Sequence, residues 1–182
     1  MGGRGSARRF INAENYSMPN VDKTILEKEY FGSLNFSKIN TSLRNENLEN
    51  VKDVIKVIDK NMKPLGKNIT VERFVNDFFI EKVFGKKIDT IKKSDIVGKE
   101  RIDKGYMSTS TEKSNIPYFA TTKIKMIIDV PKGTKVLFST KNKGTQEDEH
   151  EMLIHRGVKY KVLNFDKSFA DSDYTMKVKV IK

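Results

Sequence analysis

The spacing of apolar residues changes once along the chain, and this change constrains the fold more than any other feature. Between residues 48 and 62, apolar residues recur at steps of three and four, as on one face of an α-helix: Leu48, Val51, Val54, Ile55, Ile58 and Met62. From residue 68 onward, short stretches alternate apolar and polar residues, as is typical of β-strands. Helices followed by strands predict an α+β fold, in which N-terminal helices pack on a mostly antiparallel two-sheet β-sandwich.

The helical part is expected to hold two helices. The first begins near Asp22 and ends before Gly32. The segment 37–44 has a mixed pattern that favours neither helix nor strand. Asn47 is expected to cap the second, longer helix, which ends before Pro64.

The strand part is expected to begin with residues 68–74, a strand that ends in an arginine. One or two small helices are expected between residues 78 and 100. Further strands are expected at 105–110, 123–130, 136–138, 151–154, around 160–162 and at 176–180, the last two as an antiparallel pair. A long polar loop at 139–148 separates two of these strands, and such loops often carry function on a rigid scaffold.

Length and composition restrict the architecture and the chemistry. A chain of 182 residues fits one domain, so we expect a flexible basic lead over 1–20 and one folded domain over 21–182. The absence of cysteine excludes disulfides, thiolate catalysis and a cysteine zinc site. His150 and His155 would point to opposite faces of a strand, so no metal site is expected.

The formal charge of +11 favours contact with polyanions such as nucleic acid. The lysines are spread along the whole sequence, however, and no aromatic platform for single strands is evident, so a generally solvated basic surface accounts for the charge at least as well. No apolar run is long enough to span a membrane, and the N-terminus lacks a Sec signal. We expect a soluble monomer with no membrane contact.

One acidic segment is unusual in so basic a chain. In an extended strand, Glu149 and Glu151 share one face about 7 Å apart, with His150 on the other face. Two such carboxylates can stabilise a developing cation, or act as a base and an orienting group for a nucleophile. A solvated acidic turn before an edge strand is the other interpretation. Glu147 and Glu149 form a second Glu-x-Glu, but the apolar strand that follows Glu151 favours the first pair.

Arg73, the run Ser108-Thr109-Ser110 and the pair Glu149 and Glu151 lie on separate expected strands. This set resembles the Arg, Ser-Thr-Ser, Glu-x-Glu signature of mono-ADP-ribosyltransferase toxins, above all the enzymatic components of clostridial binary toxins such as iota toxin. The segments 40–44, 67–71, 104–110, 130–133 and 149–154 occur in the family's order. The resemblance covers about residues 36–165.

The resemblance implies a transferase that uses NAD as substrate, breaks the bond between nicotinamide and ribose, and needs no metal. Glu151 would stabilise the oxocarbenium-like transition state, and Ser108 would hold Glu151 in place. Arg73 would bind the NAD pyrophosphate, for which a guanidinium offers paired donors. Thr109 and Ser110 would keep the strand and loop in register.

Two positions depart from the family pattern at the expected NAD site. Phe74 stands where the family often has a second arginine, so contacts with NAD can differ there. An arginine that the binary toxins use in the strand at 123–130 has no clear counterpart, and Lys125 is a candidate substitute.

Glu149 carries the expected target specificity. In the family, Glu-x-Glu accompanies modification of arginine, whereas Rho-modifying exoenzymes carry Gln at the first position and modify asparagine. The expected partner is therefore a target protein with a reactive arginine, with actin only a family-level guess. The enzyme would act in the cytoplasm where it is made, or be delivered into a cell by a phage or an injection apparatus. A transferase acting on nucleic acid and a non-catalytic binding module on the same scaffold are the alternatives.

Overall fold

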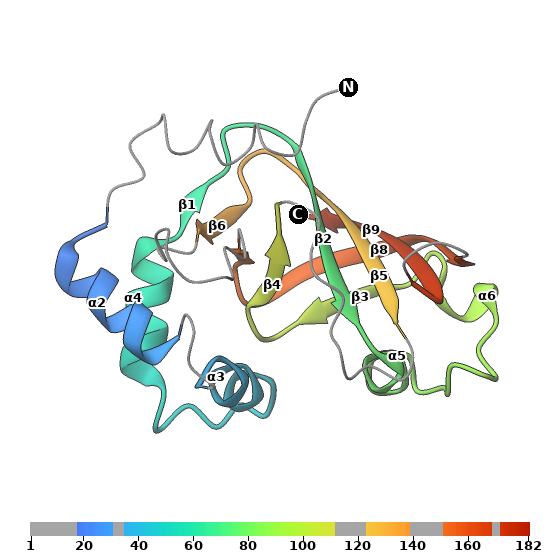
Figure 1. The fold of residues 1–182 in the computed structure, drawn as a ribbon, viewed down its shortest axis with the longest axis horizontal. Helices are drawn as coiled ribbons and strands as arrows, with labels where there is room; N and C mark the ends of the chain where they lie inside the picture. The colour runs from blue at the N-terminus through green and yellow to red at the C-terminus, as the bar shows by residue number, and fades with distance from the viewer. Residues whose placement is uncertain (1–17, 31–34, 112–122, 139–150, 169–171) are drawn as a thin grey trace.

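A computed structural model describes residues 18–30, 35–111, 123–138, 151–168 and 172–182 (Figure 1). The helices are α2 (Asn20–Glu29), α3 (Asn35–Arg44), α4 (Lys52–Asn61), α5 (Asp77–Phe84) and α6 (Lys93–Ile96). The strands are β1 (Lys63–Pro64), β2 (Ile69–Val75), β3 (Glu100–Asp103), β4 (Met107–Ser110), β5 (Ile124–Val130), β6 (Lys135–Phe138), β7 (Glu151–Ile154), β8 (Val158–Lys167) and β9 (Tyr174–Ile181). Most of the expected basic lead over 1–20, the expected polar loop at 139–148 and Glu149 lie outside these ranges.

The strands follow the order β1-β6-β7-β4-β2-β5-β9-β8-β3, and every neighbouring pair is antiparallel except β5 and β9. One register pair, Glu72 opposite Ser110, joins β2 to β4. The sheet therefore divides into a short half, β1-β6-β7-β4, and a long half, β2-β5-β9-β8-β3. The expected α+β architecture with a mostly antiparallel sheet is confirmed.

The main core fills the space between the two halves. Alternate residues of β5 point into it, and Ile124, Met126 and Ile128 are fully buried there. Such alternation is typical of a strand with one face on the core. Ile80 of α5 and Ile96 of α6 complete this core, so both small helices pack on the inner side of the sheet.

A second core lies between the N-terminal helices and the other face of the short half. Ile55 and Ile58 of α4 pack there with Leu137 and Leu153 from β6 and β7. Figure 1 shows α2, α3 and α4 gathered at one end of the molecule, beside β1 and β6. The helices therefore cover the face of β4 and β7 on which residues 108, 110 and 151 lie.

Two helix predictions were wrong, for one local reason. Residues 35–44 form α3, and the next helix begins only at Lys52, after Val51. The amide of Asn47 donates to the carbonyl of Ser42 at 3.0 Å, so Asn47 belongs to the turn that ends α3 and caps no helix. The short strands β1 and β3 were not anticipated either, because β1 is exposed at both residues and β3 buries only Asp103.

No helix among the described ranges is long and apolar enough to cross a membrane.

Candidate active site

Ser108 and Glu151 meet on neighbouring strands. Ser110 lies opposite Glu151 in the register of β4 and β7, and Ser108 lies opposite Leu153. Because residues two apart share a face, both serines flank the Glu151 side chain. The Ser108 hydroxyl donates a hydrogen bond of 2.5 Å to Oε1 of Glu151. This short bond holds the half-buried carboxylate in one direction.

Thr109 points to the opposite face of β4. Its side chain is 4% exposed, and its hydroxyl donates to the Met152 carbonyl at 2.7 Å. That bond ties β4 to β7 directly beneath Glu151. The middle residue of the Ser-Thr-Ser run thus supports the strand pair and the outer two border the carboxylate.

Arg73 lies on β2, with its side chain 19% exposed. Its Nη1 is 3.8 Å from Oδ2 of Asp103, and its guanidinium lies 5.7 Å from the centre of the Phe79 ring. Burial lowers the pKa of Arg73, while the charge of Asp103 opposes that shift. Nη1 is buried and finds no hydrogen-bond acceptor among the described residues. The arrangement leaves a cationic donor that an anion can satisfy.

Asp103 joins three parts of the chain at this point. Its carboxylate accepts bonds from Nε and Nη2 of Arg44 at 3.0 and 3.1 Å and from the amide of Gly105 at 2.9 Å. A side chain does not fit at Gly105, because a Cβ there would lie 2.9 Å from Oδ1 of Asn40 and 3.1 Å from Nη2 of Arg44. These contacts hold the end of β3 against both β2 and the end of α3.

Arg44 and Asp103 were not assigned roles from the sequence. Arg44 ends the segment 40–44 that forms part of the family resemblance, so a signal existed. Nothing in the sequence pointed to Asp103, because its contacts with Arg44 and Arg73 depend on where β3 lies in the folded protein.

Tyr30 connects the carboxylate side of the site with the arginine side. Asn40 donates to its hydroxyl at 3.1 Å, and the ring meets Tyr106 edge to face with centroids 6.1 Å apart. Burial raises the pKa of Tyr30, the charge of Glu151 adds to this, and Arg73 opposes it. The hydroxyl therefore stays protonated while it lies within the electrostatic reach of both Glu151 and Arg73.

Phe74 and Lys125 do not join the arginine cluster. They are opposite each other in the register of β2 and β5, with the Lys125 ammonium 5.8 Å from the centre of the Phe74 ring. Arg73 is opposite the buried Met126, so it points to the other face of the sheet. Glu149 lies outside the described residues, and Phe138 packs in the main core.

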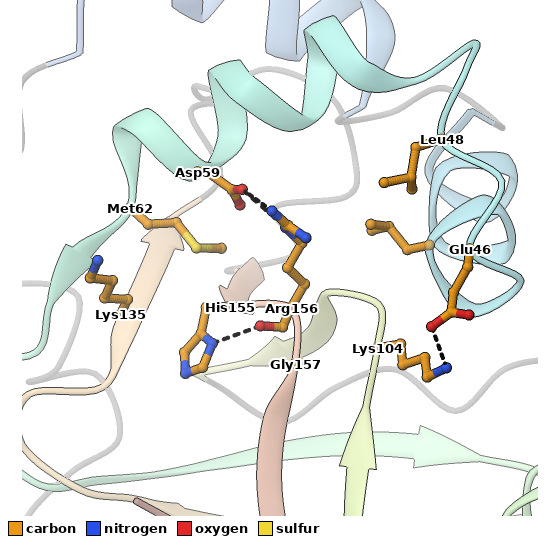
Figure 2. Close-up of a pocket in the computed structure, with 10 residues that line it drawn as sticks. Glu46, Leu48, Asp59, Met62, Lys104, Lys135, His155, Arg156 and Gly157 are labelled. Carbon is orange, nitrogen blue, oxygen red and sulfur yellow. Dashed lines mark hydrogen bonds and ion pairs between the residues drawn. The ribbon is translucent and has the colours of Figure 1, made fainter.

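A cavity of about 530 Å³ lies elsewhere, at the end of β7 away from Glu151 (Figure 2). It is lined by side chains from α4, from the turn after β7 and from the segments around Glu46 and Lys104. Four of its charged residues form two ion pairs, Arg156 with Asp59 and Lys104 with Glu46 at 2.7 Å, and Lys135 also lines it. His155, on its wall, belongs to no group of three metal-ligating side chains within the described residues.

The comparisons with known proteins decide the family. A model of the ADP-ribosyltransferase exoenzyme family matches residues 11–181. The chain belongs to this family. The resemblance seen in the sequence is confirmed, and with it transferase chemistry. No curated protein sequence matches the chain significantly.

Solved structures of the family share the fold at low sequence identity. Plx2a, an ADP-ribosyltransferase toxin from Paenibacillus larvae, is 19% identical with a TM-score of 0.73, covering 98% of this chain and 96% of that one. C3stau2 from S. aureus, solved with NAD, is 20% identical with a TM-score of 0.76 over 97% of this chain and 95% of that one. The enzymatic component C2-I of the Clostridium botulinum C2 toxin is 19% identical with a TM-score of 0.72, and the match covers all of this chain and 47% of C2-I.

Proposed function

We propose that this protein is an NAD-dependent mono-ADP-ribosyltransferase that modifies an arginine of a target protein. The observation that carries the proposal is the hydrogen bond from Ser108 to Glu151, which holds a carboxylate in a fixed direction between two serines. A carboxylate held in place before reaction stabilises positive charge that appears only in the transition state. We also propose that residues 21–182 form the catalytic domain, with 1–20 as a lead segment.

The arginine cluster suits the anionic part of NAD. Arg73 and Arg44 share the single carboxylate of Asp103, so the cluster keeps a surplus positive charge. A phosphate oxygen would provide the acceptor that Nη1 of Arg73 lacks among the described residues. Arg73 would therefore hold the pyrophosphate, and the bidentate pair of Arg44 with Asp103 would keep Arg73 in position.

The proposed reaction replaces one bond at C1′ of the ribose by another. The bond from C1′ to the nicotinamide nitrogen breaks, and nicotinamide leaves with the bonding electron pair as a neutral molecule. Glu151 stabilises the positive charge that develops on the ribose. A guanidinium nitrogen of the target then bonds to C1′ and loses a proton, which Glu149 accepts.

The arginine target rests on Glu149, by the family resemblance. A carboxylate at that position can bind a guanidinium through paired hydrogen bonds and orient it toward the reacting carbon. On this proposal, Glu149→Gln abolishes transfer to arginine but leaves slow NAD hydrolysis. Glu147→Gln, which changes the neighbouring Glu-x-Glu, is the matched control and keeps both activities.

Labelled NAD tests the function directly. Purified parent and Glu151→Gln are incubated with NAD labelled in the ADP-ribose part, in bacterial and in animal-cell lysates, with part of each sample treated with nuclease. The proposal expects a nuclease-resistant, labelled protein band with the parent alone, removed by hydroxylamine under conditions that cleave arginine linkages. If the label were instead sensitive to nuclease, the protein would be a transferase that acts on nucleic acid. No label and no NAD hydrolysis would leave a non-catalytic binding module.

A further inference from the structure

The cavity of Figure 2 has the size and the mixed lining of a small-molecule site. Its volume of about 530 Å³ falls within the range of about 300–1,000 Å³ that is typical of ligand pockets. Leu43, Leu48 and Met62 form the apolar part of its lining, and most of the remaining lining residues are charged. None of these side chains takes part in the proposed transfer reaction, so a ligand bound here would be distinct from NAD.

Both carboxylates of the lining are already neutralised. The carboxylate of Glu46 lies 2.7 Å from the Lys104 ammonium. The Asp59 carboxylate binds Arg156 at 2.9 Å and accepts a hydrogen bond of 2.6 Å from the Tyr106 hydroxyl. A cationic ligand would have to displace one of these partners before it could reach a carboxylate. The lining therefore disfavours a cation.

Lys135 is the lining cation that these two ion pairs leave out. It is an exposed residue at the start of β6, and its ammonium has no ion pair or hydrogen bond with any residue that the structure describes. The amide of His155 donates to the Lys135 carbonyl at 3.1 Å, and Met62 directly precedes β1, which pairs with β6. This end of the cavity therefore combines an available positive charge with an apolar side chain, and an anionic group is favoured there.

The apolar lining continues beyond this charged end. Figure 2 shows Lys135 and Met62 on one side of the ion pair between Arg156 and Asp59, and Leu48 on the other side. Apolar groups of a ligand gain free energy when they leave water for such a lining. An inorganic anion would leave the apolar lining unused, and an uncharged apolar molecule would leave Lys135 unused. The lining fits a molecule that joins one anionic group to an apolar body.

We propose that the cavity binds an amphipathic organic anion, whose carboxylate contacts Lys135 and whose aliphatic chain lies along Met62 and Leu48. The site lies at the end of β7 away from Glu151, and its occupation requires neither NAD nor turnover. Failure of this proposal is therefore distinguishable from failure of the proposed function.

Three ligands separate the contributions of charge and chain. The full chain is titrated by calorimetry, without NAD, with octanoate, with acetate and with octylammonium. Octanoate carries both features, acetate lacks the chain, and octylammonium carries the opposite charge. Acetate and octylammonium should bind at least about tenfold more weakly than octanoate. Along the series butanoate, hexanoate and octanoate, affinity should rise about threefold for each methylene group that enters the cavity.

Lys135→Met tests the anionic end. Methionine keeps an unbranched side chain but removes the charge, so octanoate should bind about five- to tenfold more weakly. Lys132→Met is the matched control, because it removes the same charge three residues earlier, at an exposed position outside the lining. It should change the affinity less than twofold. This contrast excludes a general attraction of a basic chain for anions.

The proposal would be overturned by any of three results. Octanoate could fail to bind to the full chain. The two lysine variants could lose the same affinity, which would make the binding non-specific. Octylammonium could bind as tightly as octanoate, or the affinity could be independent of chain length, and the lining would then select neither the charge nor the apolar body.

Discussion

Two arginine–carboxylate clusters of the molecule differ in their balance of charge. At the end of β3, two guanidinium groups, those of Arg44 and Arg73, share the carboxylate of Asp103. At the cavity in Figure 2, Arg156 binds Oδ2 of Asp59 through Nε at 3.0 Å and Nη2 at 2.9 Å. The first cluster keeps a surplus positive charge, and the second is balanced.

The balanced cluster is also saturated with hydrogen bonds. The hydroxyl of Tyr106 donates to Oδ1 of Asp59 at 2.6 Å, and Arg156 occupies Oδ2. At the other cluster, Nη1 of Arg73 is buried without an acceptor among the described residues. The cavity lies beside the saturated cluster, whereas the unmet donor belongs to the cluster around Asp103. On the proposed function, the surplus charge at Arg44 and Arg73, and not the cavity, marks the NAD site.

The largest expected effect comes from removing the charge of Glu151. Glu151→Gln keeps the size of the side chain and should lower the rate of nicotinamide release by about a thousandfold or more, since the charge acts on the transition state. His155→Gln, on the wall of the cavity, should leave the rate unchanged. Nicotinamide release is measured by chromatography. Equal rates in the parent and Glu151→Gln would remove Glu151 from the mechanism.

The two shared carboxylates should differ in their effect on stability. Asp103→Asn leaves two partly buried guanidinium groups without a counter-charge and should lower the free energy of unfolding by about 2–3 kcal/mol. Asp59→Asn breaks a more exposed pair and should cost about 1 kcal/mol. Urea unfolding of both variants measures the difference. If Asp59→Asn lowered the free energy of unfolding more than Asp103→Asn did, the distinction between the balanced and the unbalanced cluster would be wrong.

Ser108 should act as a positioning residue through Glu151. Ser108→Ala removes the bond that holds the carboxylate and should lower kcat about ten- to thirtyfold, with little change in KM for NAD. Ser108→Thr retains a hydroxyl and should restore most of the rate. If Ser108→Ala instead raised KM and left kcat unchanged, the serine would contact NAD and not orient Glu151.

The smallest effect concerns a balanced carboxylate in the helical layer. Asn61 donates a hydrogen bond of 3.0 Å to the Asp22 carboxylate, and the Lys60 ammonium lies 3.0 Å from the same carboxylate. Both contacts lower the pKa of Asp22 from its ordinary value of 3.8. Because the folded pKa is lowered, the stabilisation is present above about pH 3.8 and is lost as the pH falls further. Asp22→Asn should flatten the dependence of melting temperature on pH below that value, whereas the fully exposed Asp53→Asn should not.

Much of the fold could be predicted from the sequence because its strands have one face on the core. The alternation in β5, β8 and β9 matches most of their burial, although the apolar Ile127 and Leu163 fall on the side away from the core and β8 has a register shift between Val162 and Asn164. The boundaries between helices could not be predicted, since the turn after α3 is set by backbone bonds from Asn45 and Asn47 that any residue can make. Asn47 carries a strong capping side chain and caps nothing.

The residues of the candidate site could also be predicted only in part. The sequence indicated Arg73, Ser108 and Glu151 as a pattern, and the structure places Ser108 and Glu151 in contact. The sequence did not reveal Asp103, which follows no motif and reaches Arg44 across 59 positions of the chain.

Calorimetric titration with NAD tests the central claim most directly. It is carried out in the Glu151→Gln background, so that NAD is not consumed, with Arg73→Lys and Arg156→Lys compared at equal net charge. Lysine cannot reproduce paired guanidinium donors. The account predicts that Arg73→Lys weakens NAD binding at least about tenfold and that Arg156→Lys changes it less than twofold. Equal affinities for both variants, with both folded, would contradict the assignment of the surplus charge at Arg73 to the NAD pyrophosphate.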